Sequence, residues 1–151
     1  MGAEAAALAK TGQQDILDTA RTAFAAVEKL YAEVRSLVAA QVSTDGKIAS
    51  AKFEAAQHQA HGLAWLATYV ESIREMIAYA ERLRGEGRYG ETEDLLTRIG
   101  IGEYLSQIFG GIPMNQGEFI RPEDFGLAAE KVATLRAGAV AQMIALGNTS
   151  D

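Results

Sequence analysis

Large apolar residues recur every three or four positions along four stretches of the chain, a spacing typical of helices with one buried face. The stretches are residues 13–42, 50–84, 91–109 and 128–146. The first two predict rods of about 45–50 Å, whereas the other two predict rods closer to about 30 Å. No segment alternates convincingly as a strand would. The residues in the middle of the two long stripes are predicted to be buried: Val27, Val34, Leu66, Val70, Ile73 and Ile77.

Turn-forming residues separate these stretches. Residues 43–49 begin with Ser-Thr-Asp-Gly, residues 85–90 begin with two glycines in three positions, and residues 110–121 begin with a glycine pair and contain a proline. Because the connections are short, we expect consecutive helices to be antiparallel neighbours. The predicted fold is therefore all-α, an antiparallel four-helix bundle with two long and two shorter helices.

Glycine and proline refine this picture in the last third of the chain. Gly100 and Gly102 weaken the third helix, and a close approach of two helices is one reason to retain such residues. Pro122, which is followed by two acidic residues, predicts a helix start.

Length and composition indicate one globular domain. The chain has 151 residues, of which 48% are hydrophobic and 23% are charged, so residues 1–151 form a single predicted domain. Residues 1–12 are predicted to be flexible. The chain has no cysteine, which excludes disulfides and thiolate metal sites within it.

Charge and hydropathy point away from nucleic acids and membranes. The net charge is −6, and the 14 basic residues are scattered among 20 acidic ones, whereas phosphate binding needs clustered Lys and Arg. No apolar run approaches the length needed to cross a bilayer, and no secretory signal is recognised. We therefore expect a cytoplasmic protein that binds neither nucleic acid nor membrane.

The two histidines of the chain, His58 and His61, share a predicted helical face with Glu54. A metal ion can be imagined there, but di-iron bundles use a Glu-x-x-His pair on each of two helices. Ala55 and His58 occupy the positions three residues before the histidines, so neither pair exists. Ordinary polar histidines are the favoured interpretation, and we predict no metal site. Nothing in the sequence pairs a serine with a histidine, so no catalytic residue is predicted.

The segment from Gln107 to Gly111, with the letters Q-I-F-G-G, is a more specific signal. A helix that ends in paired glycines exposes backbone N–H groups, which can accept a phosphate or pyrophosphate. The alternative interpretation, which we favour from the residues alone, is a glycine C-cap of the helix.

This segment resembles the Q-x-x-G-G stretch in the C-terminal helical domain of acyl-CoA dehydrogenases. Residues 61–71, 90–96 and 108–114 further resemble one branch of that family, the methylsuccinyl-CoA dehydrogenases, which carry an extra helical region ahead of the dehydrogenase body. The match covers most of residues 15–127 and corresponds to that N-terminal region. In the family's C-terminal bundle the Q-x-x-G-G stretch helps to hold the FAD of a neighbouring subunit. The resemblance therefore implies flavin contact by Gln107, Gly110 and Gly111.

The departures from the family pattern limit what the resemblance implies. The β-domain and catalytic glutamate of an acyl-CoA dehydrogenase belong to a body that this chain lacks, so no catalytic residue is carried over. Ile112, Pro113 and Met114 replace the glycine and aromatic residue that usually follow the glycine pair. We therefore expect FAD to belong to the parent family, without tight binding by this chain.

Two functions remain open at this point. The first is an accessory N-terminal helical domain of an FAD-dependent acyl-CoA dehydrogenase, which serves assembly or pocket shape and is not catalytic alone. The alternative is a stand-alone, non-enzymatic interaction or dimerisation module. Helices of unequal length would leave part of the long apolar stripes exposed, so the expected partner is a second copy or a dehydrogenase body.

Overall fold

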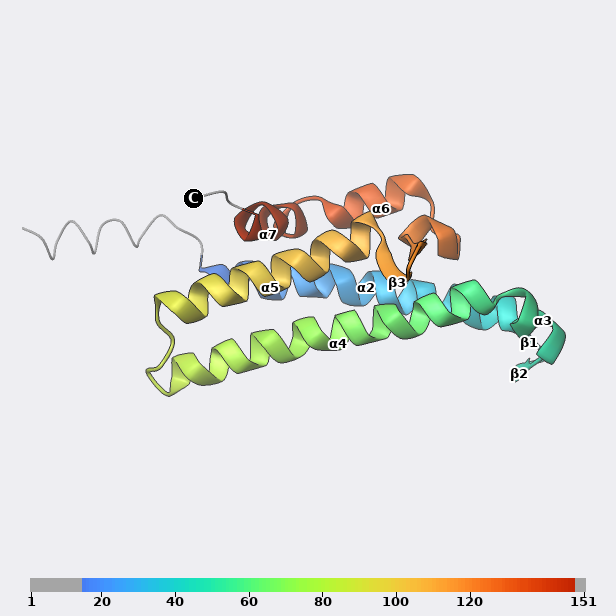
Figure 1. The fold of residues 1–151 in the computed structure, drawn as a ribbon, viewed down its shortest axis with the longest axis horizontal. Helices are drawn as coiled ribbons and strands as arrows, with labels where there is room; N and C mark the ends of the chain where they lie inside the picture. Colours follow the sequence, from blue (N-terminus) through green and yellow to red (C-terminus); the bar gives the residue numbers. More distant parts are fainter. Residues whose placement is uncertain (1–14, 149–151) are drawn as a thin grey trace, which may run out of the picture.

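A computed structural model describes residues 15–148 and shows a mainly helical chain (Figure 1). The predicted helical class is thus confirmed, but a simple four-helix bundle is not. The described part contains six α-helices and two small antiparallel hairpins. The predicted flexibility of residues 1–12 lies outside the described residues.

Helix α2, Ile16–Val42, is the central element, and α4, α7, α6 and α5 all contact it. Asp15 is the N-cap of this helix, and its carboxylate accepts a hydrogen bond of 3.0 Å from the backbone N–H of Leu17. Arg84 donates to the same carboxylate and holds the pKa of Asp15 below its ordinary value. One face of the helix is buried along its whole length: Ile16, Leu17, Thr19, Ala20, Ala23, Val27, Leu30, Val34, Val38 and Val42.

The predicted helix over residues 50–84 is broken near its start, so this prediction was wrong at one point. It divides into α3, Ser50–Ala55, and α4, Gln57–Gly85. Ala56 separates them with φ −110° and ψ 24°. Helix α4 lies along α2, and the core prediction for the two long helices is confirmed, because all six residues are buried: Val27, Val34, Leu66, Val70, Ile73 and Ile77.

The expectation that the chain contains no strand was also wrong. Strands β1, Ser43–Thr44, and β2, Lys47–Ile48, form a hairpin across Asp45 and Gly46, both of which have positive φ. Strands β3, Ile112–Asn115, and β4, Glu118–Ile120, form a second hairpin within the segment predicted to be irregular. These strands have two to four residues, too few for an alternating pattern to be recognised.

The C-terminal part contains three more helices. Helix α5, Glu91–Gly110, matches its prediction closely. The helix start predicted at Pro122 is one short 3-10 turn, η1, Pro122–Phe125. The predicted helix over 128–146 divides into α6, Ala129–Arg136, and α7, Ala139–Gly147, because Gly138 has φ 62°, a conformation that ends a helix.

Helices α5 and α7 approach closely at two glycines. A Cβ added to Gly102 would lie 2.9 Å from the Cα of Gly147 and 2.9 Å from the carbonyl oxygen of Met143. One added to Gly100 would lie 2.7 Å from the sulfur of Met76 on α4. The predicted close approach of helices at these glycines is therefore confirmed, and it brings α5 against both α7 and α4.

The long pair α2 and α4 extends beyond α5 at the end that carries β1, β2 and α3 (Figure 1). Both ends of the α2 stripe, Ile16 and Val42, are buried, whereas the second long stripe begins at Phe53, which is 42% exposed. The expectation that part of the long stripes faces water therefore holds for the second stripe and not for the ends of α2. The helices described between residues 15 and 148 include none that combines the length and the hydrophobicity of a membrane-spanning helix. In the same described part of the chain, seven large apolar residues are exposed: Ile48, Phe53, Tyr79, Leu95, Leu96, Ile99 and Phe119.

The helix contact at Gly102 gives a direct test of the packing. Replacing Gly102 by Ala should lower the free energy of unfolding by about 1–3 kcal/mol, since backbone atoms of α7 leave no room for the methyl group. Urea unfolding followed by circular dichroism measures this. Gly110→Ala is the matched control, because nothing lies within 4 Å of its added Cβ. Equal midpoints for the two variants would contradict the close approach.

Candidate functional site on helices α4 and α5

The C-terminal end of α5 carries the three residues that the sequence resemblance singled out. Gly110 is the last residue of the helix and Gly111 caps it, donating its backbone N–H to the carbonyl of Gln107 at 2.8 Å. The carbonyl of Gly110 accepts a hydrogen bond of 3.0 Å from Nε of Arg121. The glycine C-cap favoured from the sequence is therefore confirmed.

The side chain of Gln107 is held by two hydrogen bonds within the chain. Its Oε1 accepts from the hydroxyl of Tyr69 at 2.6 Å, and its Nε2 donates to Glu103 at 2.6 Å. Burial raises the pKa of Tyr69, and Tyr104 and Glu103 raise it further, so the hydroxyl remains a donor. Gln107 thus links α5 to α4 through its side-chain amide.

Aromatic rings continue from this link along α4. The ring of Tyr69 packs edge-on against Tyr104 of α5, with centroids 4.7 Å apart, and against Trp65, with centroids 6.4 Å apart. Nε1 of Trp65 donates to Nε2 of His61 at 3.0 Å. A row of aromatic side chains therefore connects Gln107 to His61.

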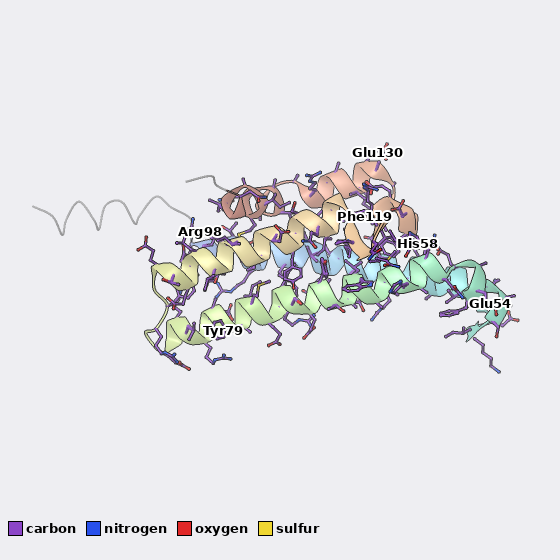
Figure 2. The ribbon with its side chains drawn as sticks, in the orientation of Figure 1. Glu54, His58, Tyr79, Arg98, Phe119 and Glu130 are labelled. Atoms are coloured by element: carbon purple, nitrogen blue, oxygen red, sulfur yellow. The ribbon has the colours of Figure 1, made fainter. Side chains whose placement is uncertain are left out.

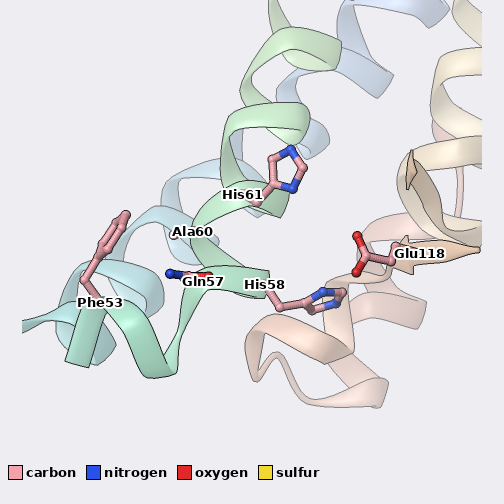
Figure 3. Close-up of a pocket in the computed structure, with 6 residues that line it drawn as sticks. All are labelled: Phe53, Gln57, His58, Ala60, His61 and Glu118. Atoms are coloured by element: carbon pink, nitrogen blue, oxygen red, sulfur yellow. The ribbon is translucent and has the colours of Figure 1, made fainter. Parts of the chain in front are cut away.

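A surface pocket of about 680 Å³ lies at the far end of this row (Figure 3). His58 and Glu118 face one another across it from α4 and β4, and His61 lies one turn further along α4. The pocket is lined by Phe53, Gln57, His58, Ala60, His61 and Glu118. It offers imidazole, amide and carboxylate groups to a ligand at an open surface.

Close packing seats the β3–β4 hairpin beside the pocket. Ile120 is fully buried against Gly62, where an added Cβ would lie 2.3 Å from Cδ1 of Ile120 and 3.1 Å from Cζ of Phe125. This contact fixes the hairpin that carries Glu118. Glu54, the third member of the imagined metal face, does not line the pocket, and residues 15–148 contain no group of three side chains placed to hold a metal ion.

The sequence had singled out only part of this arrangement. Glu103 lies four residues before Gln107 on one helix, so its spacing could have indicated the contact. Tyr69, Arg121 and Glu118 come from other elements, and no local pattern marks them as neighbours of the predicted residues.

Comparison with known proteins confirms the predicted resemblance. The chain is 47% identical over 142 residues to the (2S)-methylsuccinyl-CoA dehydrogenase of Cereibacter sphaeroides. The alignment covers 92% of this chain but 25% of that enzyme, so the chain spans about a quarter of the length of its relative. This extent is consistent with a resemblance to one region of the enzyme, the N-terminal one. No family model matches the chain.

The link between α4 and α5 can be tested by removing one hydroxyl. Tyr69→Phe should lower the free energy of unfolding by about 0.5–1.5 kcal/mol, because Gln107 loses a partner while the ring packing stays. Thermal unfolding measures the change. Tyr79→Phe is the matched control, since this tyrosine is 52% exposed on the same helix. A Tyr69→Phe variant as stable as the wild type would show that the hydrogen bond from Tyr69 to Gln107 does not stabilise the packing of α4 against α5.

Proposed function

We propose that this chain is an accessory helical domain of an FAD-dependent dehydrogenase similar to methylsuccinyl-CoA dehydrogenase. Its role is assembly or the shaping of the acyl-CoA pocket, and catalysis belongs to another part of the enzyme. The observation that carries this proposal is the alignment, which covers nearly the whole chain but a quarter of the relative. A segment with its own buried core fits a domain added to a larger body.

Flavin contact by Gln107, Gly110 and Gly111 remains a prediction from the resemblance. The side-chain amide of Gln107, the carbonyl of Gly110 and the N–H of Gly111 all have partners within the chain. A flavin would have to displace those bonds or use other groups. We therefore propose that these residues act chiefly as the link between α4, α5 and the β3–β4 hairpin.

The second candidate function is an interaction module that works without a dehydrogenase body. It is supported by the apolar side chains exposed together on α4 and α5, Tyr79, Leu95, Leu96 and Ile99, since such groups commonly mark interfaces. The expected partner is then another protein or a second copy. We further propose a cytoplasmic location, with which a chain that has no cysteine is compatible.

A chimera tests the accessory-domain proposal. In the Cereibacter sphaeroides enzyme, the segment aligned with this chain is either replaced by the chain or deleted. Replacement should preserve a stoichiometric FAD and methylsuccinyl-CoA oxidation, measured by dye reduction. Deletion should reduce the yield of assembled flavoprotein or its activity by about tenfold or more. If activity alone falls, the activation free energy rises by roughly 1.4 kcal/mol or more.

The isolated chain is the control for both arms, and it should bind no FAD tightly and reduce no dye. A deleted enzyme as well assembled and active as the intact one would contradict the proposed role. A yellow preparation of the isolated chain with stoichiometric FAD would contradict the assignment of flavin binding to the rest of the enzyme.

A further inference from the structure

The outer surface of α5 is apolar near its N-terminal end. Leu95, Leu96 and Ile99 are 51%, 64% and 53% exposed. Their spacing places them on the side of the helix opposite Ile101 and Leu105, which are fully buried. Helix α5 therefore carries apolar side chains on both sides, although only one side is covered.

Tyr79 of α4 extends this surface, which we call the α4–α5 face and define by Tyr79, Leu95, Leu96 and Ile99. Figure 2 shows Tyr79 on α4, and its side chain is 52% exposed. A recess of about 230 Å³ between the two helices is lined by Met76, Tyr79, Glu93, Leu96 and Thr97. Such a recess suits one large apolar anchor from a partner, surrounded by a wider apolar contact.

Acidic side chains surround the face. Exposed glutamates lie one helical turn from its members: Glu75 before Tyr79, Glu91 before Leu95, and Glu103 after Ile99. Glu93 lines the recess itself. The nearby basic groups are fewer. Arg98 pairs with Asp94 at 2.6 Å, whereas the guanidinium of Arg82 stacks on the ring of Tyr79 at 5.1 Å and places one positive charge at that edge of the face.

We propose that the α4–α5 face binds an amphipathic helix whose leucine, isoleucine or phenylalanine side chains are flanked by lysine or arginine. The apolar part of the face consists of four side chains, which suits one helix laid in a groove. Each partner of a stable dimer buries roughly 800 Å², spread over about 20–30 residues, which is far more than these four side chains provide. A second copy would also bring two acidic rims together, whereas a basic helix complements the rim.

The assignment of this helix to a particular protein rests on the proposed function. The alignment covers 25% of the relative, so three quarters of that enzyme lie outside it and are the proposed source of the helix. The chemistry of the face stands independently, because it follows from the exposed side chains and the surrounding carboxylates of this chain.

A peptide titration tests the face on the full chain. The probe is a fluorescein-labelled helical peptide of about 18 residues, with leucine on one side and lysine on the other. A peptide with glutamate in place of lysine is the control. Fluorescence anisotropy should show saturable binding of the lysine peptide and at least about tenfold weaker binding of the glutamate peptide. Raising the salt concentration from about 50 to about 500 mM should weaken the binding of the lysine peptide severalfold.

Two variants locate the binding. The double substitution Leu96→Asp and Ile99→Asp should weaken the binding of the lysine peptide by about tenfold or more. The matched control is Ile48→Asp, because Ile48 is 72% exposed on the β1–β2 hairpin, far from this face (Figure 1). The charge reversal Glu91→Lys with Glu103→Lys keeps the apolar face. This variant should bind the glutamate peptide more tightly than the lysine peptide. Far-UV circular dichroism confirms that each variant is folded.

Each outcome decides the proposal. It is overturned if the wild type fails to bind the lysine peptide, or if Ile48→Asp weakens binding as much as the double variant. Self-association of the wild type that is lost in Leu96→Asp with Ile99→Asp, measured by sedimentation equilibrium, would make a second copy the occupant and also overturn it. A chimera that fails while the peptide result holds refutes the proposed function alone. A chimera that works while the peptide result fails refutes the face alone.

Discussion

The structure depends on the need to cover one long apolar stripe. Helix α2 buries one face from Ile16 to Val42, and a stripe of that length requires partners along all of it. Helix α4 covers one side, and α6 and α7 share the other in tandem because Gly138 turns the chain between them. Helix α5 is then held between α4 and α7 through the close approach at Gly102. The remaining outer surface of α5 has no covering element within residues 15–148.

Much of this arrangement could be predicted from the sequence, where apolar periodicity is strong. The long stripes gave the burial of residues such as Val70 and Ile73, because a helix in a core repeats its contacts every three or four residues. The break at Ala56 could not be predicted, since Ala55 and Ala56 both favour a helix and neither a glycine nor a proline marks the site. Periodicity also could not show which apolar side of α5 is covered, because α5 carries apolar residues on both sides. Contacts with other helices decide which side is buried, and Leu96 lies on the side that stays exposed.

The candidate site shows the same division between local and distant contacts. The C-cap at Gly111 follows from local backbone preferences and was predictable, whereas the bond from Tyr69 to Gln107 joins residues on two helices. With its amide engaged by Tyr69 and Glu103, Gln107 stabilises the helix packing. This structural role of Gln107 agrees with the proposed accessory role of the chain, in which the α4–α5 face is the proposed contact surface.

The reactivity of a single introduced thiol shows directly whether the α4–α5 face is covered when the chain is part of a larger enzyme. The chain has no cysteine, so Leu96→Cys and Ile48→Cys each create one site for maleimide labelling that mass spectrometry can quantify. The rates are compared in the isolated chain and in the Cereibacter sphaeroides enzyme that carries the chain in place of its aligned segment. We expect the Leu96→Cys thiol to react rapidly in the isolated chain and at least about tenfold more slowly in the assembled enzyme, relative to Ile48→Cys. Equal relative rates in the two forms would contradict this expectation.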